Sequence, residues 1–153
     1  MTLAVLAEEL PPASAWAEAN GWSFQFDKRA LEIAAARPHP ADGYPLLLLG
    51  GVDGYRALPP SWRFVHHQTR QPAPEATPTR DSVNGRASVI HSPGIICAHF
   101  SRTAYRQYTP SGPHGNWQLE SWDTIREGVQ AHCLVEMLAV IDHHLAWSKG
   151  RLK

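Results

Sequence analysis

The chain has 153 residues, of which 43% are hydrophobic and 18% are charged, and its formal net charge is zero. This composition is that of a globular protein and excludes an intrinsically disordered chain. Because the charges balance and no basic stripe stands out, the sequence argues against a protein that binds nucleic acid by neutralising phosphates. We expect a single domain over residues 1–153.

The first apolar run and the cysteines bear on the cellular location. Residues 3–7 form an apolar run that is too short for a membrane span and lacks the basic flank of a signal peptide. The two cysteines, Cys97 and Cys133, cannot make a disulfide framework, and no CxxC pair predicts a zinc site. We therefore expect a cytoplasmic protein with reduced thiols and no membrane partner.

The first part of the chain predicts a helix followed by strands. Residues 3–20 are rich in alanine and leucine, which favours a helix, and Pro11 and Pro12 should interrupt it or delay its start. Aromatic residues that alternate with polar ones, and a run of four leucines, then indicate strands. The expected strands lie at residues 22–26, 31–35, 46–49 and 62–65.

The second part is less regular. Residues 68–82 are rich in proline, threonine and charge, and we expect an exposed, mobile connection there. From Trp117 onward the pattern becomes helical, with apolar residues at helical spacing at Leu134, Met137, Leu138, Ile141 and Leu145. Strands in series between terminal helices indicate an α+β fold with an antiparallel meander of about four strands, an irregular segment around Cys97 and C-terminal helices.

Three further residue assignments follow from the same patterns. Cys133 lies on the predicted C-terminal helix and is expected to pack in the core. The pairs His66-His67 and His143-His144 are expected at the surface, where the second pair would face the negative end of the helix.

Residues 55–64, Tyr-Arg-Ala-Leu-Pro-Pro-Ser-Trp-Arg-Phe, resemble the Tyr-Pro-x-x-Pro-Pro-x-x-x-Phe signature of ubiquitin-conjugating enzymes. Two consecutive prolines remove two donors and fix φ, so the chain must leave the sheet there as an extended arm. Downstream, Cys97 follows two isoleucines and resembles the Ile-Cys of the family's catalytic stretch, while His91 holds the place of the histidine in its His-Pro-Asn motif. A tryptophan, Trp117 or Trp122, and an amphipathic helix follow in the family's order.

The sequence also departs from the family pattern. Arg56 replaces the first proline of the signature, and His91-Ser92-Pro93 replaces His-Pro-Asn, so the asparagine that supports the oxyanion in the family has no match. The gap from His91 to Cys97 is shorter than usual, and the gap from Cys97 to Trp117 is longer. These differences resemble divergent bacterial members more than the eukaryotic enzymes, and an inactive variant of the same fold is an open alternative.

The resemblance implies that Cys97 accepts a ubiquitin-like protein as a thioester from an activating enzyme and passes it to a target amine, with no cofactor and no metal. Candidate supporting residues are His91, His99 and Asn116, with Asn84 as a further candidate oxyanion donor. If residues 95–99 are extended, Cys97 and His99 point to the same face. The family also implies that the activating enzyme meets the N-terminal helix, and that the ubiquitin-like protein meets the last helices and the rim around Cys97.

Other interpretations of Cys97 compete with this one. Its apolar neighbours are compatible with an inert cysteine in the core. His91, Cys97 and His99 would supply three ligands of a catalytic zinc site, although no fourth ligand is evident. A cysteine hydrolase would take the partners of Cys97 from His114 or His132 and Asp123.

Overall fold

The computed structural model describes residues 2–110 and 119–153. Helix α1 (Thr2–Ala19) begins the chain and is followed by four strands: β1 (Ser23–Asp27), β2 (Glu32–Pro38), β3 (Pro45–Gly51) and β4 (Ser61–Val65). Two short strands come next, β5 (Ile90–His91) and β6 (Ile95–Ile96), and helix α2 (Leu134–Leu145) lies near the end. Single 3-10 turns occupy Pro74–Ala76, Arg102–Ala104 and Trp122–Thr124.

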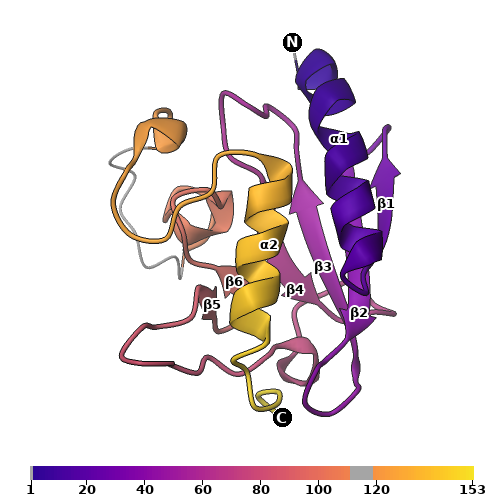
Figure 1. Cartoon of the computed structure of the whole chain (residues 1–153), viewed down its shortest axis with the longest axis vertical. Helices are drawn as coiled ribbons and strands as arrows, with labels where there is room; N and C mark the ends of the chain where they lie inside the picture. Colours follow the sequence, from indigo (N-terminus) through magenta and orange to yellow (C-terminus); the bar gives the residue numbers. More distant parts are fainter. Residues whose placement is uncertain (1, 111–118) are drawn as a thin grey trace.

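The strands form one antiparallel sheet in the order β1-β2-β3-β4-β6-β5. Strands β1 to β4 are the predicted meander, in which Ile33 pairs with Gly50 and Gly50 pairs with Trp62. The expected α+β class is confirmed, and the last two strands extend the sheet beyond the four that the sequence indicated. They lie at the edge opposite β1, which places Cys97 at that side of the sheet (Figure 1).

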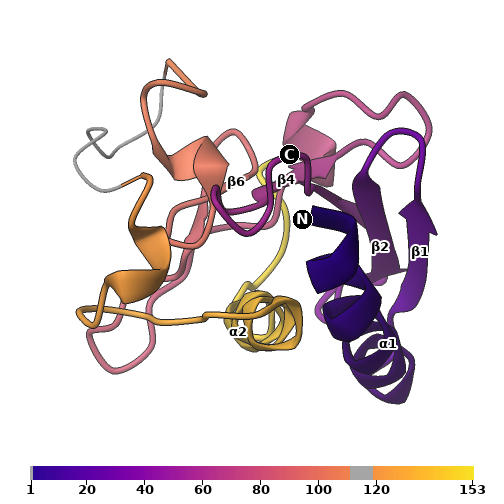
Figure 2. The same ribbon diagram turned by 90° about the horizontal axis from the view of Figure 1, so that it is seen from above.

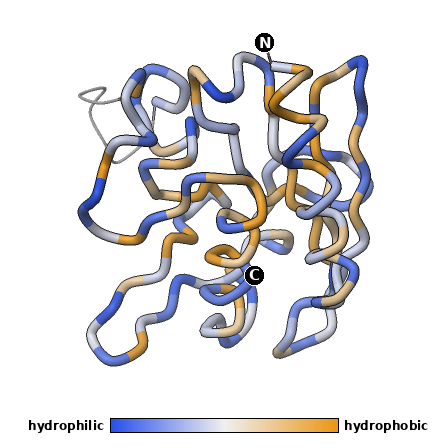
Figure 3. The backbone as a smooth tube through the Cα atoms, turned by 45° about the horizontal axis from the view of Figure 1, so that its top comes forward, coloured by the Kyte–Doolittle hydropathy of each residue, from blue (hydrophilic) through white to orange (hydrophobic). Residues whose placement is uncertain are grey.

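Both helices cover the same face of the sheet and lie beside each other (Figures 1 and 2). The main hydrophobic core fills the space between them and the strands. Apolar positions gather in these helices and strands, whereas the outer loops are mostly hydrophilic (Figure 3). Gly50 contributes to this packing by having no side chain, because a Cβ there would lie 2.4 Å from the Trp62 ring. Trp62 therefore packs directly on the backbone of β3, and it is fully buried.

The other face of the sheet is also covered, which explains the four leucines of β3. Leu47, Leu49 and Val65 form a second, smaller cluster on that face. The 3-10 turn Pro74–Ala76 lies against β3, and Ala76 is fully buried. Strand β3 is thus covered on both faces, which accounts for its run of consecutive apolar residues.

The same turn corrects our expectation for residues 68–82. We expected an exposed connection, but Ala76 and Thr77 are buried. The chain beyond them is held by the C-terminal segment, because the Thr79 amide donates to the Gly150 carbonyl at 2.9 Å and the Leu152 amide to the Thr77 carbonyl at 2.9 Å. The apolar side of β3 needs a cover, and this segment supplies it despite its polar composition.

Helix α1 corrects another expectation, because it runs through Pro11 and Pro12 without a break. Both prolines are exposed, and so are Ala7 and Glu8. The carbonyls of Ala7 and Glu8 have no helical donor, because Pro11 and Pro12 lack the amide hydrogen. Water can hydrogen-bond those carbonyls, so the usual cost of a proline inside a helix is reduced here. No helix among residues 2–110 and 119–153 is long and apolar enough to cross a membrane.

The C-terminal region has less helix than predicted. In the described part, residues 119–133 are irregular apart from one 3-10 turn, and α2 begins only at Leu134. Cys133 precedes the helix and is half-buried, so it is not a core position of α2. His143 is exposed as expected, but His144 is only 4% exposed, and its Nδ1 accepts the Val89 amide at 2.8 Å. The prediction of a surface position for His144 was wrong because α2 turns this residue toward the strands at the sheet edge.

Candidate functional site

Cys97 directly follows β6 at the edge of the sheet. Its amide donates to the Val89 carbonyl at 2.7 Å, which continues the pairing of β5 and β6 by one residue. The side chain is half-buried and lines an open groove of about 730 Å³. Cys97 is thus not a fully buried core residue, and it borders the groove.

A tight turn fixes how the chain reaches Cys97. Gly94 has a φ of +106°, a conformation that side chains other than glycine rarely adopt. Its carbonyl accepts the Phe64 amide at 2.7 Å, and its own amide donates to the backbone carbonyl of His91 at 2.7 Å. A Cβ at Gly94 would lie 2.8 Å from the Phe64 carbonyl oxygen, so only glycine permits this close approach to β4. The turn thereby docks the hairpin, and with it Cys97, onto the sheet.

The proline pair upstream is tied to the segment that follows Cys97. Arg102 is only 4% exposed, and its Nε donates to the Pro59 carbonyl at 2.7 Å while its amide donates to the Pro60 carbonyl at 2.8 Å. Its guanidinium also lies 3.3 Å from a carboxylate oxygen of Asp53 and donates to the Asp53 carbonyl at 2.5 Å. Because prolines offer carbonyls but no amides, the arm needs an outside donor, and Arg102 is that donor. No periodic pattern in the sequence indicates this role of Arg102.

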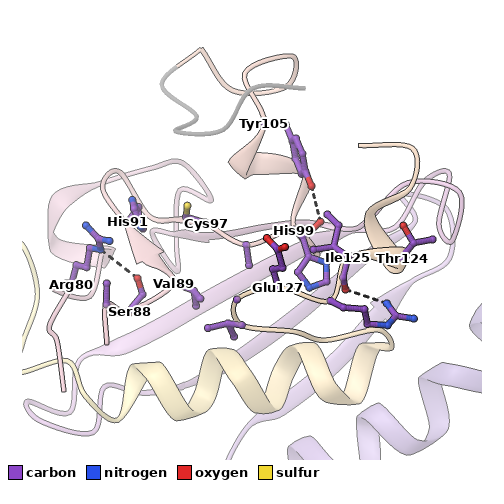
Figure 4. Close-up of a pocket in the computed structure, with 15 residues that line it drawn as sticks. Arg80, Ser88, Val89, His91, Cys97, His99, Tyr105, Thr124, Ile125 and Glu127 are labelled. Atoms are coloured by element: carbon purple, nitrogen blue, oxygen red, sulfur yellow. Dashed lines mark hydrogen bonds between the residues drawn. The ribbon is translucent and has the colours of Figure 1, made fainter. Parts of the chain in front are cut away.

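His99 lines the same groove, but its ring is held away from Cys97. Residues 98–100 form a turn, so the condition that residues 95–99 are extended is not met. The His99 Nδ1 donates to the Trp122 carbonyl at 2.9 Å, and the ring lies 5.4 Å from the His132 ring. Figure 4 shows the ring directed toward α2, whereas the Cys97 sulfur points to the opposite side. Burial, together with the nearby His132 and Arg126, lowers the pKa of His99, so this side chain is neutral at neutral pH.

Arg56, which replaces the first proline of the signature, also has defined partners. Arg56 Nη1 lies 3.3 Å from a carboxylate oxygen of Glu9, and its guanidinium lies 5.4 Å from the centre of the Trp122 ring. Trp122 is fully buried and donates to the Arg56 carbonyl at 3.1 Å. The Tyr55 hydroxyl donates to Glu9 at 2.7 Å, and Glu9 also accepts the amide of Leu134 at the start of α2. This network joins both helices to the wall of the groove.

Arg80 is the charged residue that sequence reasoning missed. It lines the groove with Cys97, and its Nε donates to the Ser88 carbonyl at 3.3 Å (Figure 4). Burial raises the pKa of the Cys97 thiol, and the positive charge of Arg80 acts in the opposite direction. Nothing in the sequence distinguished Arg80 from the other arginines, because only the fold brings residue 80 to Ser88, before the edge strand β5 that pairs with β6.

The remaining candidates lie at different places. His91 ends β5 and lines the groove, at the end where Arg80 and Cys97 also lie (Figure 4). Asn84 is exposed in the turn between Val83 and Arg86 and does not line the groove. Asn116, His114 and Trp117 lie outside the described residues.

The alternatives to an acyl carrier gain little from this arrangement. Among residues 2–110 and 119–153, no three His, Cys, Asp or Glu side chains lie close enough together to hold a metal ion, so a His91, Cys97 and His99 zinc site has no geometric support. His132 lies beside His99, and Asp123 lies 3.8 Å from Arg56, so neither supplies a hydrolase triad with Cys97.

Comparison with known proteins found no match to this chain among protein-family models, curated proteins or solved structures. The interpretation of the groove therefore depends on its own geometry and chemistry.

Proposed function

We propose that this protein is a carrier similar to the ubiquitin-conjugating enzymes, in which Cys97 accepts a ubiquitin-like protein from an activating enzyme and passes it to an amine. The observation that carries the proposal is the position of Cys97. It is half-buried in an open groove, directly after the last strand of a helix–meander fold and next to the segment that anchors the proline pair. A bound acyl group would be accessible from the groove in this position.

The chemistry consists of two acyl transfers through one sulfur. The Cys97 thiolate attacks the carbonyl carbon of the incoming thioester, a new carbon–sulfur bond forms, and the thiolate of the activating enzyme leaves. The amine of a target lysine then attacks the new thioester, its nitrogen loses a proton to solvent, and the Cys97 thiolate leaves. No metal, cofactor or oxidant is consumed in either step.

Activation of the thiol is the demanding step. The thiolate is the reactive form, and the burial that raises the pKa of Cys97 disfavours it. Arg80 offsets part of this effect, and its positive charge also suits the negative charge that develops on the carbonyl oxygen. We therefore assign to Arg80 the supporting role for which the family uses an asparagine, with His91 at the same end of the groove as the second candidate.

The proposed function also implies which surfaces meet the partners and where the protein is located. The activating enzyme would meet α1, and the ubiquitin-like protein would meet α2 and the rim around Cys97. A cytoplasmic location is supported by the two cysteines, which are not joined in a disulfide. A binding protein without transfer activity is the alternative that the test below distinguishes.

The test uses a peptide that ends in Gly-Gly as a thioester of mercaptoethanesulfonate, mixed with the intact chain and followed by intact mass spectrometry. We expect an adduct that hydroxylamine removes, that is absent in Cys97→Ala and that persists in Cys133→Ala. Cys133 is the matched control because it is also half-buried and burial also raises its pKa. Added lysine should release the adduct as an amide.

Two outcomes contradict the proposal. Equal labelling of Cys97 and Cys133 would show only the background reactivity of a thiol with a thioester. A peptide that binds without forming any adduct would favour the binding protein.

A further inference from the structure

Two histidines that are far apart in the sequence lie side by side in the fold. The ring centres of His99 and His132 are 5.4 Å apart, and the ring planes are inclined by 41°. His99 is 9% exposed, and its Nε2 atom has no hydrogen-bond partner among the described residues. The Nδ1 atom of His132 is also buried, and the described part of the chain offers it no partner either. Buried polar atoms without a partner cost stability, so two of them on neighbouring rings need an explanation.

The other nitrogen of each ring shows which atoms carry the protons. Nδ1 of His99 lies 2.9 Å from the Trp122 carbonyl, so it is the protonated nitrogen of that ring. Gln130 donates its side-chain amide to the Arg126 carbonyl, which leaves its Oε1 atom for Nε2 of His132 at 3.4 Å. Nε2 is therefore the protonated nitrogen of His132. Both unpartnered nitrogens are thus lone-pair acceptors in the neutral rings.

This arrangement is typical of histidines that bind a metal ion. A metal-binding histidine usually donates its other ring N–H to a carbonyl or carboxylate oxygen, and both rings face such a carbonyl oxygen here. Neutral imidazole suits zinc and related divalent transition metals. With Zn–N bonds of about 2.0 Å, two imidazoles on one tetrahedral ion have ring centres about 5 Å apart, close to the 5.4 Å in this structure.

Packing holds both histidines in place. The His99 ring stacks on Trp122 with ring centres 6.3 Å apart, and the Phe100 ring meets its edge. The amide of His132 donates to a carboxylate oxygen of Glu136 at 2.8 Å, which fixes this residue to the first turn of α2. The two rings are therefore positioned before any ion binds, which lowers the entropic cost of binding.

The charges around the pair are compatible with a cation. Burial is the main cause that lowers the pKa of His99, and Arg126 acts in the same direction, so Nε2 stays unprotonated at neutral pH. Two carboxylates oppose the charge of Arg126, because Glu127 lines the groove with His99 and Glu136 holds the His132 amide. Metal binding requires neutral imidazoles, and these surroundings supply them.

We propose that His99 and His132 bind a divalent transition metal ion of the zinc class through Nε2 and Nδ1, respectively. Within residues 2–110 and 119–153, no third His, Cys, Asp or Glu side chain completes the site, so water fills the remaining positions. Figure 4 shows the His99 ring directed away from the Cys97 sulfur, so the site is separate from the proposed carrier chemistry. The ion links the segment after Cys97 to the chain that precedes α2.

The experiment adds Zn²⁺ to ¹⁵N-labelled protein at neutral pH and follows the histidine ring nitrogens by long-range ¹H–¹⁵N NMR. Before addition, the spectra should show the proton of His99 on Nδ1 and that of His132 on Nε2. Zn²⁺ should then shift the signals of His99 Nε2 and His132 Nδ1 and leave the ring nitrogens of the other histidines largely unchanged. This measurement locates the ion without any substitution.

Variants test the same site by isothermal titration calorimetry with Zn²⁺. His132 is only half-buried, and His132→Gln should weaken binding at least about tenfold. His67→Gln is the matched control, because His67 is also half-buried, has an unpartnered buried Nδ1 and lies 4.7 Å from the His66 ring. Nδ1 of His66 already accepts the amides of Gln68 and Thr69, so that pair does not offer two free lone pairs. His67→Gln should leave the affinity unchanged.

Thiolates also bind zinc, so the titration is repeated with Cys97→Ser and with Cys133→Ser. Both variants should bind Zn²⁺ as the unsubstituted protein does. Loss of binding in either one would place the ion on a thiol and overturn the proposal.

Absence of any zinc-dependent shift at His99 and His132 would also overturn it and would leave a buried water or a shared proton between the two nitrogens. Shifts confined to other histidines would do the same. The carrier assay contains no added metal, and the zinc titration contains no thioester. The two proposals can therefore succeed or fail independently.

Discussion

The sheet has a meander side, formed by α1 and strands β1 to β4, and a site side, formed by β5, β6 and the chain around Cys97. These two sides are stabilised in different ways. On one side, α1 and strands β1 to β4 bury regular apolar patterns against each other. On the other, β5 and β6 have two residues each, and although Ile90 and Ile96 reach the same core, the chain around Cys97 is also held by hydrogen bonds between side chains and backbone. The difference suggests that changes of volume should damage the meander, whereas loss of single polar anchors should damage the site.

The largest effect is expected for Arg102→Ala, on the site side. The buried guanidinium holds the Pro59 carbonyl, the Asp53 carbonyl and a carboxylate oxygen of Asp53. Removal leaves the carbonyl of buried Pro59 without this donor and empties a buried site, whereas the Asp53 side chain is 69% exposed and can turn to water, so the free energy of unfolding should fall by about 3 kcal/mol. Urea denaturation followed by tryptophan fluorescence measures it.

Arg106→Ala is the matched control, because Arg106 is exposed and close in sequence. A change within about 0.5 kcal/mol is expected for it. If Arg102→Ala proves equally mild, the anchoring of the proline arm does not stabilise the fold and the contrast between the two sides fails.

The next largest effect concerns His144, which links helix α2 to the backbone of Val89. His144 is buried and accepts the Val89 amide, and burial lowers its pKa from 6.5 to about 4. The unfolded chain therefore takes up the proton first, so stability is fully present above pH 6.5 and falls as the pH is lowered toward 4. The loss should reach about 2–3 kcal/mol, at 1.36 kcal/mol for each pKa unit.

His144→Gln should flatten this pH dependence, measured as the free energy of unfolding at several pH values between 4 and 7. His143→Gln, on the exposed side of the same helix, should keep most of the slope. Burial also lowers the pKa of His39 and His99, so a residual slope of the same sign is expected in both variants. An unchanged slope in His144→Gln would contradict the assignment.

A smaller effect is expected on the meander side, for Gly50→Ala. The new methyl group would meet the buried Trp62 ring at 2.4 Å, and overpacking of this kind typically costs about 1–3 kcal/mol. Gly150→Ala is the control, since a Cβ there meets nothing within 4 Å. Thermal unfolding of the two variants compares them directly, and equal midpoints would show that the meander accommodates the added volume.

The same contrast explains what the sequence could predict. Alternation at Phe24 and Phe26 and the leucines of β3 indicated the meander correctly, because period-two burial is a local property of the chain. Tertiary packing overrode local preference in α1, where exposed Pro11 and Pro12 did not end the helix. It also did so at Thr77, which is buried in a segment of polar composition.

The site was predictable only in part. The family resemblance singled out Cys97, but it predicted an irregular segment there and not the two short strands β5 and β6. The orientation of His99 depends on a turn at residues 98–100 that no pattern in the sequence indicated. Arg80 and Arg102 act across large sequence separations, on Ser88 and Cys97 in one case and on Pro59 in the other. The fold brings such partners together, and their separation in the sequence follows no recognisable spacing.

The smallest effect tests whether the charge of Arg80 changes the pKa of the Cys97 thiol or whether Arg80 only shapes the groove. In a Cys133→Ala background, the rate of alkylation of Cys97 by iodoacetamide is followed against pH, which reports the pKa of this one thiol. Arg80→Ala should raise that pKa further, because the burial of the sulfur remains and the opposing positive charge is lost. Arg80→Lys should restore part of the difference, and unfolding midpoints should be the same in all three proteins because Arg80 is exposed. An identical pH profile in Arg80→Ala would mean that Arg80 only shapes the groove, whereas a shift that lysine reverses requires a charge acting on the sulfur.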